Sequence, residues 1–485
     1  MIISTNYIKG ICVVAFFALC VALLFNFSNT SIGYDTGLYH LQKIQWLSEY
    51  GHVPGLTNLD GRLGFYSLYF YLGAVVVWIT SSPEFTLYIN LVASILFVSW
   101  ACFQLIRTDS FALSILLLLS LPGLFFYENL IGPSLSQDIG AYILLVVFLF
   151  YYLRLFEQEK TPSFWWISAT IALIVSIKMS MIFLTVIILF YINDRSVLKI
   201  RENVVWITVT FALVALVIWH NYWLSGWLLY PSTAIDLFNP DWKVPAYLVQ
   251  NQQDVTSAFA KSSGSLQHVK DVHSMSLFEW VPIWFQDKSS QLWVIYGAII
   301  SICLGWGMIV GKQEFRKKAI VALISTMTFA TVLWFLTAPS PRFGFALLYG
   351  LILSGSYLLI SAIGFKLSIK QLSIAKIAGL SVLSLLFIKW SSLGSAITDG
   401  YPPLNFDLRV EIPETEFKKV HHSSYPNEIF YTPVMGEQPF LPDIQPVASR
   451  IYTDSILPFI NDVPRWRGDR VEDGYWTDSL ETVRR

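Results

Sequence analysis

Two basic side chains stand among apolar residues, where a charge is costly unless it has a function. Lys178 lies in the stretch VSIKMSM, and Arg342 lies in TAPSPRFGFAL, between two apolar runs. A lysine there can hold a lipid phosphate as a point charge, and a guanidinium can bind phosphate oxygens in a bidentate fork. Each also has a structural alternative, because Lys178 can snorkel from one long helix and Arg342 can anchor a helix end at the interface.

An acidic residue, Asp35, opens a segment that we expect to form an amphipathic helix ending at Gly51. The apolar residues of this segment recur at about helical spacing, at Leu38, Leu41, Ile44 and Leu47. Lys43 falls mostly on another face. Such a helix directly after a membrane span lies in the interface plane. Asp35 would then sit at the membrane surface, where a lipid headgroup and a water-soluble partner can meet, or it would only cap the helix.

A second acidic residue, Asp138, begins another predicted helix, after Ser134 and Ser136. Helix capping is again an alternative to a functional role. Arg62 follows the sequence NLDG, where it can contact a phosphate or pair with Asp60.

Aromatic and histidine residues give a weaker signal. Trp227 lies among aromatic residues at the end of an apolar run, which the aromatic belt of a membrane interface explains, with sugar stacking as an alternative. His220, in the same run, is interpreted as a packed or hydrogen-bonded core residue. His268, His273 and the pair 421–422 lack the spacing of a metal site.

The elements that must position these residues are membrane helices. Of the 485 residues, 55% are hydrophobic and only 13% are charged, about half the charged share of a soluble domain. Apolar runs of about 20 residues indicate membrane spans. The clear spans are 8–28, 85–105, 109–127, 138–153, 203–224, 291–310, 318–337, 343–362 and 371–390.

Two segments are less regular. Residues 65–80 are apolar but short, and residues 163–192 are too long for one span and are interrupted near Lys178. One topology places the basic connections in the cytoplasm, as the positive-inside rule requires. It makes 163–192 two short helices that meet near Lys178 at the outer side, and it makes 65–80 a re-entrant or external helix.

This topology predicts an all-α polytopic protein with about 11 transmembrane helices and a short external or re-entrant helix. The N-terminus would be cytoplasmic and the C-terminus extracytoplasmic. A membrane domain, 1–390, would carry the first polar segment, 29–64, and the second polar segment, 225–290, on the external face. Residues 391–485 form a C-terminal region with 15 acidic and 9 basic residues.

Several classes of protein are disfavoured. There is no P-loop, no Gly-rich dinucleotide fingerprint and no G-x-S-x-G motif, and no basic block points to nucleic acid. The four cysteines lie in apolar runs and form no zinc or disulfide pattern. The missing nucleotide-binding motifs disfavour a cytosolic nucleotide-linked substrate and favour a substrate that comes from the membrane.

Short motifs carry a resemblance to a known group of enzymes. They are Y-D-x-x-L-Y-H at 34–40, V-P-G-L at 53–56, N-L at 58–59, R-L-G-F at 62–65, GPSLSQD at 132–138, WLSGWLLYP at 223–231 and PSPRFG at 339–344. A span followed by an acidic residue that opens an external helix resembles the GT-C superfamily of membrane glycosyltransferases. The motifs together resemble an uncharacterised bacterial membrane family assigned to that superfamily, over roughly 1–390.

The resemblance implies sugar transfer from a polyprenyl-phosphate-linked donor, on the external face of a bacterial inner membrane, with inversion. Asp35 would be the catalytic base or would orient the acceptor. Asp138 would be a second catalytic residue that helps bind a metal or the acceptor, with Glu128 as a weaker candidate for this role. The two carboxylates are also possible ligands of a divalent cation. Lys178, Arg342 and Arg62 would bind the donor phosphate.

Acceptor binding is assigned to His40, Tyr39 and Trp227. Two alternatives remain, a polymerase or ligase of lipid-linked polysaccharide and a non-enzymatic transporter or flippase of lipid-linked saccharide.

Overall fold

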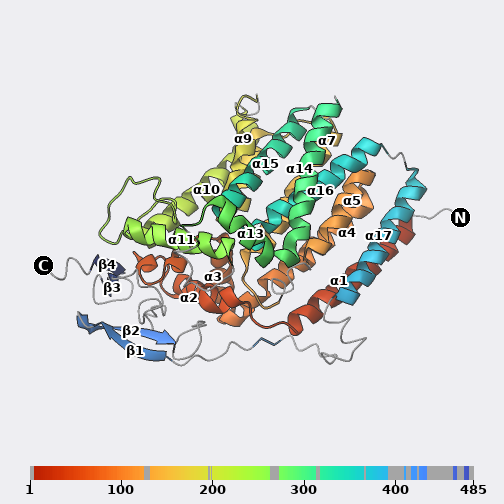
Figure 1. Cartoon of the computed structure of the whole chain (residues 1–485). Coiled ribbons are helices and arrows are strands. Elements are labelled where there is room, and N and C mark those ends of the chain that lie inside the picture. The colour runs from red at the N-terminus through yellow and green to blue at the C-terminus, as the bar shows by residue number, and fades with distance from the viewer. Residues whose placement is uncertain are drawn as a thin grey trace.

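The computed structural model describes most of the chain up to residue 390 and parts of the C-terminal region. The described residues are 5–124, 132–194, 197, 199–262, 272, 274–312, 317–364, 367–390, 409–410, 417–422, 425–433, 462–466 and 475–479. Helices make up the membrane part, as expected, and four short strands lie in the C-terminal region (Figure 1).

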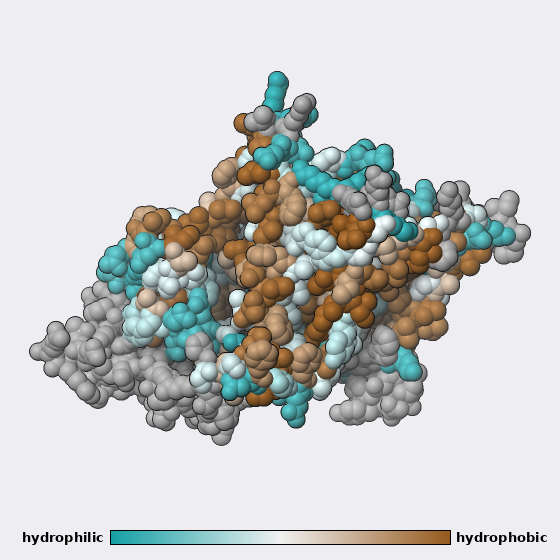
Figure 2. All heavy atoms as spheres, turned by 45° about the horizontal axis from the view of Figure 1, so that its top comes forward, coloured by the Kyte–Doolittle hydropathy of each residue, from teal (hydrophilic) through white to brown (hydrophobic). Residues whose placement is uncertain are grey.

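Eight described helices are long and apolar enough to cross a bilayer, whose hydrocarbon core of about 30 Å takes about 20 residues. They are α1 (Thr5–Ser28), α4 (Ile89–Arg107, preceded by the 3-10 turn Pro83–Tyr88), α7 (Gln137–Glu157), α10 (Ile200–Ser225), α14 (Leu292–Gly311), α15 (Lys318–Thr337), α16 (Pro341–Ile363) and α17 (Ile369–Trp390). Hydrophobic residues cover the flanks of the helices, and hydrophilic residues gather at their ends (Figure 2). The protein is therefore a multi-pass membrane protein.

Helix α16 lies at the centre of the bundle, where it packs on α14, α7, α5 (Phe111–Ser120) and α15. Glycines along α16 allow close packing: a side chain at Gly355 would meet Ser301 of α14, and one at Gly350 would meet Leu145 of α7. Helix α1 packs between α4 and α17, at the opposite edge from α10 (Figure 1). This packing brings the start of α16 beside the start of α7, which positions the candidate site.

In the part of the chain that the structure describes, four apolar helical segments are shorter than a span. Helix α8 (Phe164–Ile177) ends before Lys178, whose backbone is extended, and the chain continues as η6 (Met179–Thr185) and α9 (Val186–Leu189). With 14 residues, α8 is about 21 Å long. The break at Lys178 is the one expected from the sequence. Helix α3 (Leu68–Thr80) has 13 residues and is also too short to cross a membrane straight.

One expected span is different in the structure. Instead of a continuous helix over 109–127, α5 is a ten-residue helix followed by the 3-10 turn η5 (Pro122–Leu124). Pro122 explains the end of α5, because proline cannot donate the backbone hydrogen bond that continues a helix. Residues 125–131, including Glu128, lie outside the described residues.

The first polar segment folds into short helices. They are η1 (Thr36–His40), α2 (Leu41–Glu49), η2 (Leu56–Asn58) and η3 (Gly61–Gly64). Helix α2 packs on α3 and buries Leu41 and Ile44 completely. Gly51, with φ of 72°, follows the end of α2, as expected from the sequence.

The second polar segment contains α11 (Ala246–Lys261), α13 (Leu277–Asp287) and η9 (Ser289–Gln291). His268 and His273 lie outside the described residues. The C-terminal strands form two antiparallel hairpins, β1 (Phe417–His422) with β2 (Tyr425–Pro433), and β3 (Asp462–Trp466) with β4 (Tyr475–Ser479). Strand β4 contacts η2, so this strand lies at the same end of the bundle as the first polar segment (Figure 1).

Candidate functional site

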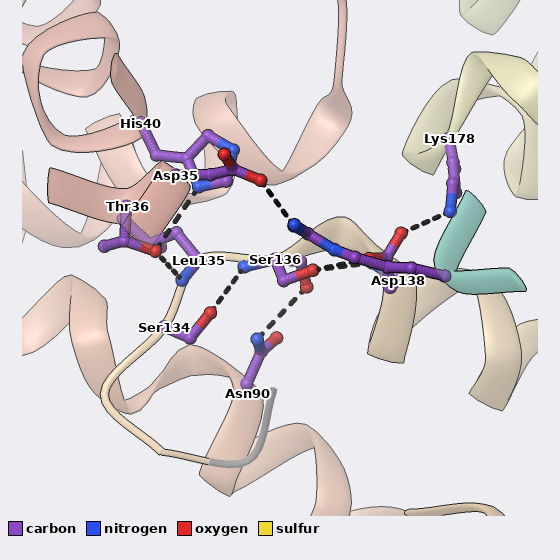
Figure 3. A network of polar contacts seen from close by, with 10 residues as sticks. Asp35, Thr36, His40, Asn90, Ser134, Leu135, Ser136, Asp138 and Lys178 are labelled. Atoms are coloured by element: carbon purple, nitrogen blue, oxygen red, sulfur yellow. Dashed lines mark hydrogen bonds and ion pairs between the residues drawn. The ribbon is translucent and has the colours of Figure 1, made fainter. Parts of the chain in front are cut away.

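Asp35 does not cap a helix. Its backbone is already helical, and its side chain makes no capping hydrogen bond. The carboxylate turns instead toward Arg342, whose Nη2 donates to Oδ2 of Asp35 at 2.5 Å (Figure 3). The side chain is 25% exposed, so the carboxylate can be reached by a substrate. The capping alternative for Asp35 is therefore wrong.

Arg342 bridges two carboxylates. It lies in the first turn of α16, after Pro341, and its Nε donates to Oδ2 of Asp138 at 3.1 Å. These two contacts use two of the five N–H donors of the guanidinium. The side chain is 35% exposed. Arg342 therefore keeps donors for an anionic ligand while both neighbouring carboxylates hold it in place.

Asp138 and Lys178 form a buried ion pair behind Arg342. Lys178 Nζ donates to Oδ1 of Asp138, and both side chains are less than a tenth exposed. Ser136, not Asp138, is the N-cap of α7, and its hydroxyl also donates to Oδ2 of Asp138 at 3.0 Å. The carboxylate of Asp138 is thus bound through both oxygens, to Lys178 on one side and to Arg342 and Ser136 on the other. Lys178 reaches it because α8 ends one residue earlier.

The loop before α7 is joined to the segment that carries Asp35. The backbone N–H of Leu135 donates to Thr36 Oγ1 at 3.0 Å, and Gly33 donates to the carbonyl of Pro133 at 3.0 Å. Asn90 of α4 donates to the carbonyl of Ser136 at 3.1 Å. Five chain segments therefore converge on one polar network, which holds the two carboxylates in a fixed relation (Figure 3).

Tyr39 and His40 lie on the same short helix as Thr36. His40 is buried, with its ring 4.3 Å from that of Tyr39 and 5.3 Å from that of Phe70. Burial lowers the pKa of His40 to about 4, although Asp35 favours its charged form. Burial raises the pKa of Tyr39, and the charge of Asp35 raises it further, while those of Arg342 and Arg62 oppose the change. Both side chains are therefore neutral near pH 7 and lie within electrostatic reach of Asp35.

Arg62 pairs with Asp60, one of the two alternatives that its sequence allowed. Its Nε and Nη2 donate to the carboxylate of Asp60, the shortest contact being 2.7 Å. Asp60 also caps η3 through the backbone N–H of Arg62. The charge of Arg62 also lowers the pKa of Tyr39, so the pair lies within electrostatic reach of η1.

Trp227 lies in a different cluster. It packs with Tyr230, Val244 and Val249, is only 4% exposed, and donates through Nε1 to the carbonyl of Val244 at 2.8 Å. Lys243 Nζ sits 4.0 Å from the ring centroid. The ring face is therefore covered and not open to a sugar. This packing argues against the expectation that Trp227 binds the acceptor.

Lys43 was expected on a polar face of α2, but it is fully buried. Its Nζ donates to the carbonyl of Leu63 at 2.7 Å and to that of Phe65, and it lies 3.2 Å from Nε2 of His220. Burial lowers the pKa of Lys43 well below its usual value. The amphipathic pattern could not reveal this, because the polar partners come from distant parts of the chain.

A hydrogen-bonded chain continues from Lys43. Nδ1 of His220 lies 2.7 Å from the hydroxyl of Tyr71, which lies 2.6 Å from Nε2 of His52. His220 is buried and hydrogen-bonded, as expected. The sequence did not predict this series of hydrogen bonds, because no spacing in the sequence marks the residues that form it.

The residues of the site do not by themselves make a metal centre. Within the described ranges, no three His, Cys, Asp or Glu side chains gather as metal ligands. Both oxygens of Asp138 are bound by other groups, and Arg342 stands between the carboxylates. A divalent cation would therefore have only Oδ1 of Asp35 as an open carboxylate ligand here, with the remaining ligands supplied by a substrate.

The bundle and its terminal polar network define a multi-pass membrane protein with an ionic site at one end. The chain belongs to the family described as a domain of unknown function, DUF8201, whose model matches residues 2–349. The matched range contains Asp35, Asp138, Lys178 and Arg342. No curated protein matches the chain, and no solved structure matches it.

Proposed function

We propose that the protein transfers a sugar from a polyprenyl-phosphate-linked donor to an acceptor hydroxyl, at the external face of the bacterial inner membrane. The contact between Asp35 and Arg342 carries the proposal. It joins a group that can accept a proton to one that can bind phosphate, and both are partly exposed at the end of an apolar bundle. These are the two functions that glycosyl transfer from a lipid phosphate needs.

Asp35 is the general base in this proposal. One of its oxygens faces Arg342, and the other, Oδ1, makes no hydrogen bond to any residue that the structure describes. That oxygen would take the proton of the acceptor hydroxyl as the hydroxyl attacks the anomeric carbon. General-base catalysis is worth roughly 10²–10⁴ in rate. Attack opposite the phosphate gives inversion at the sugar.

Arg342 binds the phosphate that leaves. A guanidinium with donors to spare stabilises the charge that develops on the leaving group as the glycosidic bond breaks. Asp138 and Lys178 have a different role in this proposal from catalysis and phosphate binding, the roles expected from the sequence. Because they are buried and bound to each other, they act as positioning residues that fix Arg342.

Tyr39 and His40 flank Asp35 on η1 and retain their assignment to the acceptor. Their neutral states suit hydrogen bonding to hydroxyl groups rather than to phosphate. Arg62 contributes to the donor side only if its pair with Asp60 opens, since that pair occupies two of its nitrogens.

The test is transfer by the purified full-length protein, with its native lipid extract as the source of donor and acceptor. Asp35→Asn should abolish transfer and leave the thermal unfolding midpoint nearly unchanged. Asp109→Asn is the matched control, because Asp109 is exposed at the opposite end of the bundle. Normal turnover in Asp35→Asn would overturn the assignment of the base.

A polymerase or ligase of lipid-linked polysaccharide is the second candidate. It is favoured by the exposure of Arg342, since such a reaction would rely on an arginine more than on Asp35. Arg342→Gln would then lose all transfer while Asp35→Asn kept most of it. A transporter or flippase would move the saccharide across vesicles and form no new glycosidic bond.

A further inference from the structure

A second polar site lies at the end of α7 that is far from Asp138. Arg154 is 16 residues further along the helix, about 24 Å at the rise of an α-helix. Here a cleft of about 500 Å³ opens between α7, the turn that follows it, α8 and α10. Its lining includes Tyr151, Arg154, Gln158, Thr161, Trp166 and Trp206. A volume of this size lies within the range of small-molecule sites.

The cation of this cleft is not paired. Among the residues that the structure describes, the guanidinium of Arg154 makes no hydrogen bond and no ion pair. Glu157 is one turn away and attracts Arg154 electrostatically, but its carboxylate accepts its hydrogen bonds from Ser110 at 2.6 Å and from Tyr357 at 3.2 Å. Arg154 therefore keeps its guanidinium N–H donors for a ligand, and Gln158 and Thr161, which carry a carboxamide and a hydroxyl, also line the cleft.

The aromatic residues of the cleft are typical of a membrane interface. Trp166 stacks on Phe148, with ring centroids 5.6 Å apart and planes 18° apart, and the hydroxyl of Tyr151 accepts from Gln104 at 3.2 Å. Trp206 is 39% exposed on α10. Packing and a hydrogen bond thus hold the aromatic rings of the α7 and α8 sides, while the ring of Trp206 on α10 is exposed.

The exposed face of α10 continues from the cleft as an apolar surface. Beyond Trp206, Phe211 is 60% exposed, Val214 45% and Ile218 38%, and these three side chains lie on one side of the helix. Only a sixth of the apolar window of α10 is buried within the protein, far less than in α7 or α16. A hydrocarbon chain can lie along this face, while a polar group cannot.

We propose that this cleft binds the headgroup of an anionic phospholipid. The phosphate contacts the guanidinium of Arg154, Gln158 and Thr161 donate to the phosphate or the headgroup, and the acyl chains follow the exposed face of α10. The combination of an unpaired cation, interfacial aromatic rings and an adjoining apolar helix face selects a lipid over a soluble anion. The site is independent of the proposed glycosyl transfer.

Lipid binding by the full-length protein, in nanodiscs of phosphatidylcholine with a minor share of phosphatidylglycerol, tests the proposal. Native mass spectrometry counts the lipids that stay bound after the nanodisc is removed. The wild type should retain phosphatidylglycerol preferentially, and Arg154→Gln should lose about tenfold or more of that preference, as expected for a hydrogen-bonded charge contact. Arg107→Gln is the matched control, because Arg107 is exposed, ends α4 at the same end of the bundle and does not line the cleft.

A second variant and a competition with inorganic phosphate complete the experiment. Gln158→Leu preserves every charge and should also weaken phosphatidylglycerol retention. It tests the site even if Arg154→Gln fails to fold. Inorganic phosphate at millimolar concentration should not displace the lipid, whereas displacement would make the cleft a site for a soluble anion. Equal retention in the wild type, Arg154→Gln and Gln158→Leu would overturn the proposal.

Discussion

The guanidinium of Arg342 donates to the carboxylate of Asp35 across 307 residues of chain. The contact joins the first turn of α16 to the segment that follows α1. The packing of α16 at the centre of the bundle fixes the backbone of Arg342, and the contact with Asp138 holds its side chain. Both side chains stay partly exposed, Arg342 at 35% and Asp35 at 25%.

Replacing Arg342 by lysine should separate charge from geometry. A lysine keeps the positive charge, but its single ammonium group cannot reproduce the planar fork that bridges Asp35 and Asp138. We expect Arg342→Lys to lower the rate of transfer by roughly 10²–10³, as for the loss of a transition-state donor, with nearly normal stability. Single-turnover transfer and thermal unfolding measure the two effects. A rate within a few fold of wild type would show that charge alone suffices.

Breaking the buried pair should destabilise the protein. Lys178→Met leaves Asp138 buried with one fewer cation, and removal of one partner of such a pair costs about 3–5 kcal/mol. Unfolding by denaturant in detergent measures the loss. In the double variant Lys178→Met with Asp138→Asn, part of the stability should return, because the uncompensated charge is gone. Additive losses in the double variant would contradict the pairing.

His40 should make stability depend on pH. Burial lowers the pKa of His40 to about 4, below the value of about 6.5 in the unfolded chain, so the unfolded state binds the proton first. The stability that His40 contributes is therefore fully present above pH 6.5 and falls as the pH drops toward 4, by about 3 kcal/mol in all. His40→Gln should flatten this part of the pH profile. Unfolding midpoints between pH 4 and 7.5 test it, and identical profiles would refute it.

Lys43 should act in the alkaline range. Burial lowers its pKa in the folded protein, while the unfolded chain holds the proton up to about 10.5. The unfolded state then binds more protons below pH 10.5, so stability should rise as the pH increases toward that value. Lys43→Met should lack this rise. Since tyrosines also titrate there, the difference between the two proteins is the quantity to measure, and a constant difference from pH 7.5 to 10.5 would contradict a depressed lysine.

The apolar spans could be predicted from the sequence. Charges are costly in lipid, so each span must be a run of about 20 mostly apolar residues. Eight of the nine clear spans correspond to helices that can cross a membrane. The break at Lys178 was also predictable, since a buried charge and two serines interrupt the run. The short helix α5 was not, because the effect of Pro122 on an otherwise apolar run depends on how the chain turns afterwards.

The partners of the charged residues could not be predicted. The sequence indicated that Asp35, Asp138, Lys178 and Arg342 deserved a role, but local patterns allowed helix caps and interfacial anchors equally well. Lys43 is a further example of a charged residue whose surroundings could not be predicted. Its position on an amphipathic helix predicted exposure, but the fold buries it.

By itself, then, the sequence determined where the chain enters an apolar medium and which few charges it carries near that medium. The tertiary structure alone decided which of those charges meet. The reason is physical: burial of apolar surface acts along each segment, whereas an ion pair over 307 residues exists only when the packing of α7, α8 and α16 has set the distance between its atoms.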